Sequence, residues 1–73
     1  MGTALRIKVE IVGGTMAGEA CEQVCELAER LRAGVEANFN GVELWAIPGD
    51  DPKVLHRHWE FALKHRVPFA IGH

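Results

Sequence analysis

Two cysteines and four histidines are the side chains of this chain that could bind a metal or act as nucleophile and base. Cys21 and Cys25 are four residues apart, so on a helix their thiols lie on the same side, one turn apart. A zinc site would need further ligands in tetrahedral geometry from elsewhere in the chain. Two small apolar thiols in a core explain the same spacing without a metal. Metal binding therefore stays an alternative, as does nucleophilic catalysis by Cys25 with a histidine. We assign no metal ligand.

The histidines cluster in the second half of the chain without the spacing of a metal site. On a helix His56 and His58 point about 200° apart, and His58 and His65 share a face about 10 Å apart, too far to bind one ion. The chain has no Ser and no Tyr, so Thr3 and Thr15 carry its only side-chain hydroxyls. A general base needs a paired nucleophile or a pocket. We therefore expect no catalytic residue and no enzymatic activity, and a solvated, weakly basic helix.

An Asn-Gly pair at residues 40–41 is the strongest local structural signal in the sequence. It lies between two alternating runs of apolar and polar residues, which is typical of a two-residue hairpin turn with positive φ at both positions. Such a turn also fixes the register of the strands. One face is then predicted to carry Phe39 opposite Val42, Ala37 opposite Leu44, and Val35 opposite Ala46.

Strands are also predicted at both ends of the chain. Four apolar residues, Leu5, Ile7, Val9 and Ile11, alternate with mostly polar ones, which indicates a strand with one buried face that stops at the glycines of residues 13–14. Those glycines favour a plain turn, with an anion-binding loop as the alternative. The apolar tail at residues 67–71 is predicted to form an edge strand or an irregular strap across the core.

Two helices separate these strands. For the first helix we expect Thr15 as N-cap and Gly34 as the left-handed residue after its end. For the second helix we expect Asp51 as N-cap and Pro52 as first residue. Apolar residues at helical spacing give the buried stripes. These are Ala17, Ala20, Val24, Leu27, Ala28 and Leu31 in the first helix, and Leu55, Trp59, Ala62, Leu63 and the stem of Arg66 in the second.

These elements predict a single α+β domain over residues 1–73 with the order β-α-β-β-α and a further strand in the tail. A right-handed crossover favours an antiparallel sheet in the order 1-3-2, or the ferredoxin-like order 4-1-3-2 if the tail pairs. Both helices are expected on one face. A sheet in which the first two strands are parallel neighbours is the main alternative.

The uncovered face of that sheet carries two residues that do not suit water, Trp45 and Ile47. An apolar pair on an exposed sheet often marks an interface; the alternative is that the C-terminal tail covers it. With Arg6 and Lys8 beside it, Trp45 also permits single-stranded nucleic-acid binding by base stacking, although the neighbouring glutamates oppose this interpretation.

Phe61 is the second misplaced aromatic residue. It lies about 160° from the buried stripe of its helix, next to Arg57 and Lys64, so an exposed Phe61 would suit an acidic partner. The alternative is that Phe61 belongs to the core. The charges are segregated as well, because the first helix is acidic and the region from Lys53 to Arg66 is basic.

Composition limits the classes of function. Eight basic and ten acidic residues give a net charge of -2, which does not indicate a nucleic-acid or membrane partner. Two cysteines are too few for a disulfide scaffold, and neither a secretory h-region nor a membrane-spanning apolar run is present. We expect a cytoplasmic protein without a cofactor.

The strings Phe-Asn-Gly-Val at residues 39–42 and Pro-Gly-Asp at residues 48–50 resemble those of small phage and prophage proteins of uncharacterised function. In these proteins a β-α-β-β core carries an Asn-Gly hairpin. The resemblance spans residues 5–55, implies a phage or prophage accessory protein, and brings no functional residue with it.

These observations together predict a protein-interaction module that binds another protein or a second copy of itself. The expected contact residues are Trp45, Ile47, Phe61, Arg57 and Lys64. Binding of single-stranded nucleic acid through the open sheet face and binding of a metal are the alternatives.

Overall fold

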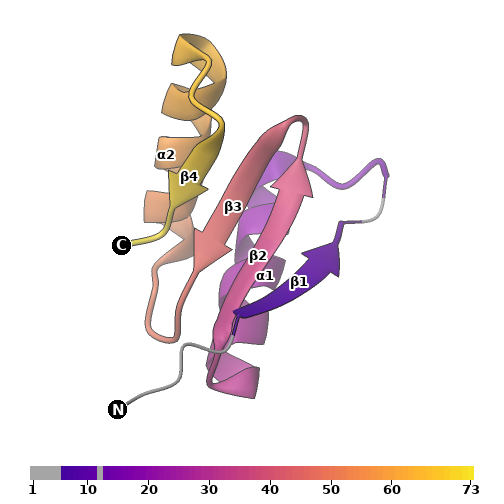
Figure 1. Ribbon diagram of the computed structural model, residues 1–73, viewed down its shortest axis with the longest axis vertical. Coiled ribbons are helices and arrows are strands. Elements are labelled where there is room, and N and C mark those ends of the chain that lie inside the picture. Colours follow the sequence, from indigo (N-terminus) through magenta and orange to yellow (C-terminus); the bar gives the residue numbers. More distant parts are fainter. Residues whose placement is uncertain (1–5, 12) are drawn as a thin grey trace.

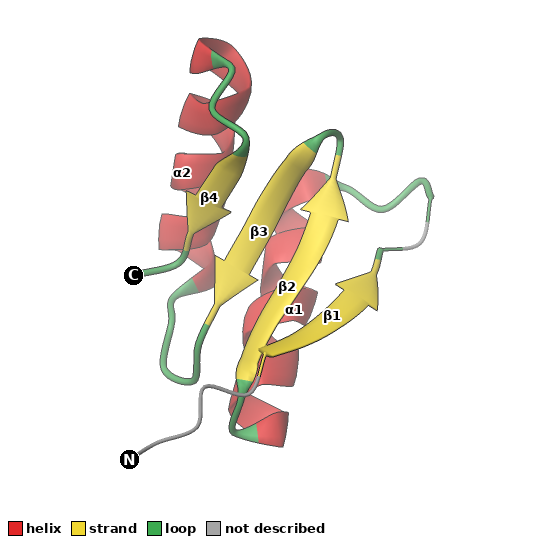
Figure 2. Cartoon of the chain, in the orientation of Figure 1, coloured by secondary structure: helices red, strands yellow, loops and turns green. Residues whose placement is uncertain are grey.

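A computed structural model describes residues 6–11 and 13–73 of the chain, so the prediction for Leu5 lies outside the described residues. A four-stranded sheet and two helices make up the fold (Figures 1 and 2). The elements follow in the order β1 (Arg6–Glu10), α1 (Ala17–Leu31), β2 (Gly34–Phe39), β3 (Val42–Ala46), α2 (Pro52–His65) and β4 (Phe69–Ile71).

The order of strands across the sheet is β1-β2-β3-β4. β1 is parallel to β2, β2 is antiparallel to β3, and β3 is parallel to β4. The expected orders 1-3-2 and 4-1-3-2 are therefore wrong, as is the expected purely antiparallel sheet. The alternative of parallel neighbours is confirmed for the first two strands, and the tail does form an edge strand.

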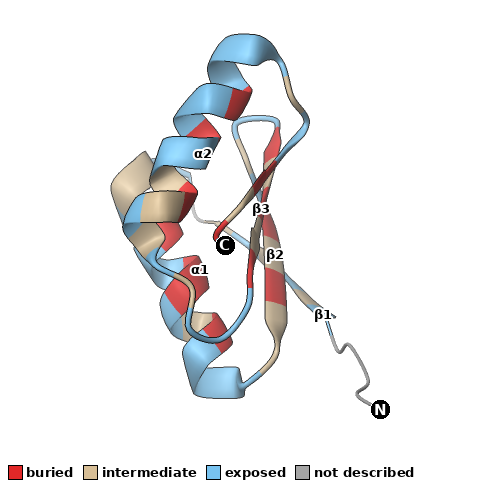
Figure 3. Ribbon diagram, turned by 90° about the vertical axis from the view of Figure 1, so that its left-hand side faces the viewer, coloured by how far each residue is buried: buried red, intermediate tan, exposed pale blue. Residues whose placement is uncertain are grey.

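Both helices cover the same face of the sheet and pack against each other, as predicted (Figure 3). Because β3 and β4 run opposite to β1 and β2, this placement gives the two crossovers opposite hands. The unit β1-α1-β2 is right-handed and the unit β3-α2-β4 is left-handed (Figures 1 and 3). Left-handed crossovers are rare, so the handedness rule opposed β4 beside β3, whereas the right-handed β1-α1-β2 unit agrees with that rule.

The predicted hairpin joins β2 to β3 with the expected register. Phe39 pairs with Val42, Ala37 with Leu44 and Val35 with Ala46. Asn40 and Gly41 have φ of 54° and 82°, the positive values that a type I′ turn requires.

The first helix begins and ends at other residues than predicted. Met16 occupies the N-cap position of α1 and supplies no side-chain cap, so Thr15 is not the cap. At the other end Arg32 takes the left-handed conformation with φ of 54°, and Gly34 already belongs to β2. The buried side of α1 is also rotated, since Cys21 and Cys25 are buried while Leu31 is exposed.

The second helix begins as predicted. The side chain of Asp51 accepts a hydrogen bond from the Lys53 N–H (2.9 Å), and Pro52 is the first helical residue. Leu55, Trp59 and Ala62 are buried. The predicted burial of Leu63 and Arg66 is wrong, because both are exposed and Arg66 ends the helix in the left-handed conformation.

The core lies between the helices and the facing side of the sheet. Its largest fully buried side chains are Leu44, Leu55, Val24, Val35 and Cys21. Within the described residues no helix is long and apolar enough to cross a bilayer.

Candidate binding surface

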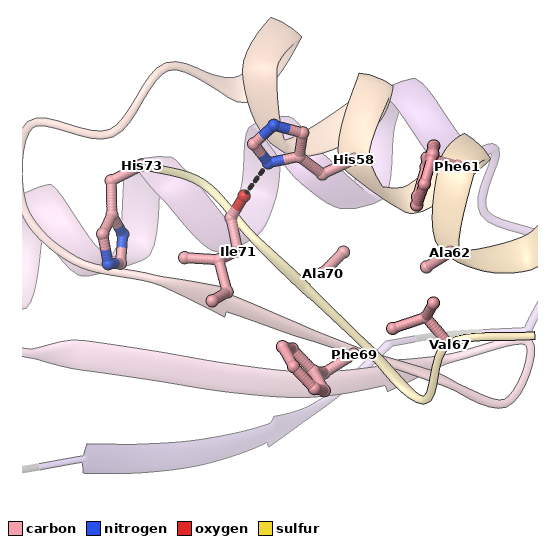
Figure 4. Close-up of a pocket in the computed structure, with 8 residues that line it drawn as sticks. All are labelled: His58, Phe61, Ala62, Val67, Phe69, Ala70, Ile71 and His73. Carbon is pink, nitrogen blue, oxygen red and sulfur yellow. Dashed lines mark hydrogen bonds between the residues drawn. The ribbon is translucent and has the colours of Figure 1, made fainter. Parts of the chain in front are cut away.

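A hollow of about 220 Å³ lies between α2 and the edge strand β4 (Figure 4). Apolar side chains from both elements line most of it. Phe61 and Ala62 come from α2, and Val67, Phe69, Ala70 and Ile71 come from β4 and the turn before it, with His58 and His73 toward the other end.

Phe61 is the most exposed aromatic residue of this groove. Its side chain is 59% exposed, and its ring lies against that of His65, with 4.2 Å between the ring centroids. The sequence left open whether Phe61 is exposed or belongs to the core, and in the structure it is exposed. Arg57 and Lys64 are exposed on the same helix but do not line the groove.

The outer edge of β4 forms one wall of the groove. Glu43 N–H donates to Pro68 O and Gly72 N–H donates to Trp45 O, both at 2.9 Å. Because bonding alternates along a parallel ladder, the peptide groups of Phe69 and Ile71 then point away from β3. The groove therefore combines apolar side chains with backbone groups that can pair with another strand.

His58 covers part of that edge. Its Nδ1 lies 2.5 Å from the carbonyl oxygen of Ile71 (Figure 4). A carbonyl only accepts hydrogen bonds, so this contact requires a proton on Nδ1. His58 therefore occupies one of the outward acceptors of β4, and its ring makes no such contact with the Phe69 peptide groups.

Trp45 lies on the open face of the sheet between two other side chains. The Arg6 guanidinium lies 4.3 Å from the centre of the Trp45 ring. The Phe69 ring stacks on the Trp45 ring, with 5.7 Å between the ring centroids and 28° between the ring planes. The indole N–H also donates to Glu43 Oε1 (2.9 Å). Trp45 is consequently half-buried, in line with the alternative that the C-terminal tail covers it.

The predicted contact residues do not form one continuous patch. Trp45 faces the open side of the sheet, Ile47 is exposed just after β3, and Phe61 lies on α2. Phe69 connects two of these places, since it stacks on Trp45 and also lines the groove beside Phe61. Sequence reasoning missed Phe69, although an inward Ala70 in the predicted tail strand would have placed Phe69 on the open face with Trp45.

The basic residues beside Trp45 are paired with a carboxylate. Arg6 and Lys8 approach Glu36 at 3.5 Å and 3.8 Å. Glu10 and Glu43 lie on the same face, by the register of the sheet. This face therefore presents mixed charge, and not the basic surface that a nucleic-acid backbone requires.

The cysteines and histidines are dispersed. Both cysteines are free thiols in the core. Burial raises the pKa of Cys21 to about 11, and burial with the nearby charge of Asp50 raises the pKa of Cys25 to about 12. His56 approaches Glu60 at 3.8 Å and His73 approaches Asp50 at 3.1 Å. Over residues 6–11 and 13–73 no three side chains of His, Cys, Asp or Glu are grouped to hold a metal ion.

No protein-family model, no curated protein and no solved structure significantly matches this chain. The resemblance to phage and prophage proteins therefore stays a prediction.

Proposed function

We propose that this protein binds an extended segment of another protein in the groove between α2 and β4. One observation supports this most directly: the apolar groove and the outward peptide groups of an edge strand lie side by side. An extended peptide that adds to a sheet edge gains affinity from backbone hydrogen bonds and specificity from pockets for alternate side chains.

The groove offers both kinds of contact. The peptide groups of Phe69 would pair with the backbone of the added segment. Phe61 and Val67 would contact its apolar side chains, since both line the groove and Phe61 is mostly exposed. Trp45 would act indirectly in this arrangement, because its ring holds Phe69 in place.

The charge of α2 indicates the flanking chemistry of the segment. Arg57 and Lys64 are exposed beside Phe61, and Glu60 is the only acidic residue of the helix. Complementary charges raise association rates and help to select partners. The preferred segment would therefore carry an apolar residue for the groove and acidic residues next to it.

Selection from a random peptide library displayed on phage, with the intact protein as bait, tests this function. Peptides that emerge are measured against the parent protein, Phe61→Ser and the matched control Leu63→Ser. Leu63 is 48% exposed on the same helix but does not line the groove. We expect Phe61→Ser to weaken binding at least about tenfold and Leu63→Ser to bind like the parent, with unchanged circular dichroism for both.

The backbone contact has its own test. N-methylation of a single amide in a selected peptide removes one hydrogen-bond donor, so methylation at alternate positions should weaken binding in an alternating pattern. Equal affinity of the parent and Phe61→Ser for the selected peptides would refute the proposal, as would a selection that enriches no peptide.

A further inference from the structure

The strand β1 forms the other edge of the sheet and is the least covered of the four strands. The helix α1 lies over β2 and β3, and α2 lies over β3 and β4. Within the described residues neither helix approaches the β1 backbone as closely as it approaches the other strands, although Val9 and Ile11 pack against the core. Its apolar side chains Ile7, Val9 and Ile11 point to the helix side of the sheet but are only partly buried.

A second hollow marks the incomplete cover. It has a volume of about 100 Å³ and lies between β1 and α1, where Val9, Ile11 and Leu27 are among the residues that line it. Leu31, one turn after Leu27 on α1, is exposed as well. An apolar strip thus runs along the β1 side of the molecule, next to a strand edge.

We propose that β1 pairs antiparallel with β1 of a second copy, around a two-fold axis that runs between the Lys8 residues of the two copies. The two sheets would then form one continuous sheet, and each copy would cover the apolar strip of the other. Such an interface is self-complementary, as two-fold symmetry requires. It uses a different surface from the groove at β4, so it does not depend on the proposed function.

The charge pattern of β1 favours a second copy in this register. With Lys8 opposite Lys8, all five residues of β1 pair, and Arg6, which also contacts Trp45 and Glu36 of its own chain, lies opposite the partner's Glu10 on the open side of the sheet. On the other side Ile7 faces the partner's Val9. Opposite charges and apolar pairs directly across an antiparallel ladder stabilise it. Lys8 meets the partner's Lys8, but each lies 3.8 Å from a carboxylate oxygen of Glu36 in its own chain.

The edge strand β4 does not offer the same complementarity to a second copy. If two copies joined through β4, the α2 helices of the two copies would lie near each other. The positive charges of Arg57 and Lys64 from both copies would then face one another, with Glu60 as the only acidic residue of the helix to offset them. Like charges across an interface cost several kcal/mol. Self-association is therefore assigned to β1.

Disulfide trapping in the full chain tests both the contact and the register. In Lys8→Cys the two new thiols face each other across the axis, about 5 Å apart between Cα atoms, which suits a disulfide. In the control Glu10→Cys they are offset by about 13 Å along the strands. The native thiols are buried in the core, so they should add little background.

Under mild oxidation we expect Lys8→Cys to form covalent dimers at least about tenfold faster than Glu10→Cys, because pairing raises the effective thiol concentration. The unmodified chain should sediment as a dimer at the higher concentrations of a dilution series. Equal or reversed rates for the two variants would overturn the register. A monomer at every concentration would overturn the dimer.

Discussion

Cys21 and Cys25 are neutral in the native core, and this gives stability a specific pH dependence. Their native pKa values are raised to about 11 and about 12, from 9.0 for an exposed thiol. Above pH 9 the unfolded chain releases these protons while the native state keeps them. The stabilisation is thus fully present below about pH 9 and is lost as the pH rises toward the native pKa values.

Urea unfolding under reducing conditions between about pH 8 and 10 measures this loss. We expect the free energy of unfolding to fall by up to about 1.4 kcal/mol per pH unit for each thiol. The double variant Cys21→Ala/Cys25→Ala is the control, since other groups still titrate in it. Equal slopes for the parent and the double variant would contradict the assignment to the thiols.

Gly72 lies so close to Asp50 that a side chain at this position would require the Asp50 side chain to shift. A Cβ on Gly72 would be 2.8 Å from Asp50 Oδ2, and that oxygen accepts a hydrogen bond from the Ile47 N–H (2.8 Å). Gly72→Ala should therefore displace the carboxylate and lower the free energy of unfolding by about 1–3 kcal/mol. Gly13→Ala is the matched control, because no atom of the described residues lies within 4 Å of its added Cβ. Chemical denaturation measures the free energy of unfolding of both variants. Equal changes in the two variants would show that the Asp50 side chain moves aside at no cost in stability.

Single residues of the candidate surface were only partly predictable from sequence. Helical spacing left Phe61 either exposed or in the core, and the structure has it exposed. Arg6 was predicted beside Trp45 and lies against its ring, but the contact with Phe69 was not predictable, since Phe69 reaches Trp45 from β4, far away in the chain. Such contacts depend on strand order and not on local pattern.

At the scale of the elements, the two helices differ in how they begin. Asp51 caps α2 through its side chain, while Met16 occupies the N-cap position of α1 without a side-chain bond. Met16 is 72% exposed, and Glu19 stands three residues later. Met16→Ser would complete a capping box with Glu19, in which each side chain accepts a hydrogen bond from the other residue's N–H.

We expect Met16→Ser to raise the free energy of unfolding by about 1 kcal/mol, and Asp51→Ala to lower it by a similar amount. Thermal or urea denaturation measures both changes. Met16→Ala is the control that removes the exposed side chain without adding a cap. A gain of the same size in Met16→Ala would show that loss of the apolar side chain, and not capping, is responsible.

Local chemistry determined how well the element ends could be predicted. Asn40-Gly41 and Asp51-Pro52 were correct because turn and cap preferences act within a few residues. The C-terminus of α1 was not, since Arg32 adopts the left-handed conformation that usually favours glycine, as Arg66 does after α2. At both positions the chain must turn into a strand at once, and this tertiary requirement overrides the residue preference.

At the scale of the whole molecule, the order of the strands was beyond sequence reasoning. Handedness excludes most topologies because right-handed crossovers dominate, yet β3-α2-β4 is left-handed here. The tail pairs with β3 because Glu43 and Trp45 bond to Pro68 and Gly72. Both helices then remain over β2, β3 and β4, which leaves β1 as the strand without a helix.

The proposed pairing of β1 predicts that the stability of the whole protein depends on its concentration. If β1 pairs with a second copy, unfolding also separates the two chains, so each tenfold rise in protein concentration adds up to about 1.4 kcal/mol per dimer. The urea midpoint of the parent should rise accordingly across a concentration series. Glu10→Arg, which places an arginine opposite the partner's Arg6, should largely remove this rise. Glu22→Arg makes the same charge change on an exposed position of α1, and the midpoint of this variant should still rise with concentration, because the position lies outside the paired strand. A urea midpoint of the parent that does not depend on protein concentration would mean that one copy alone forms the stable unit.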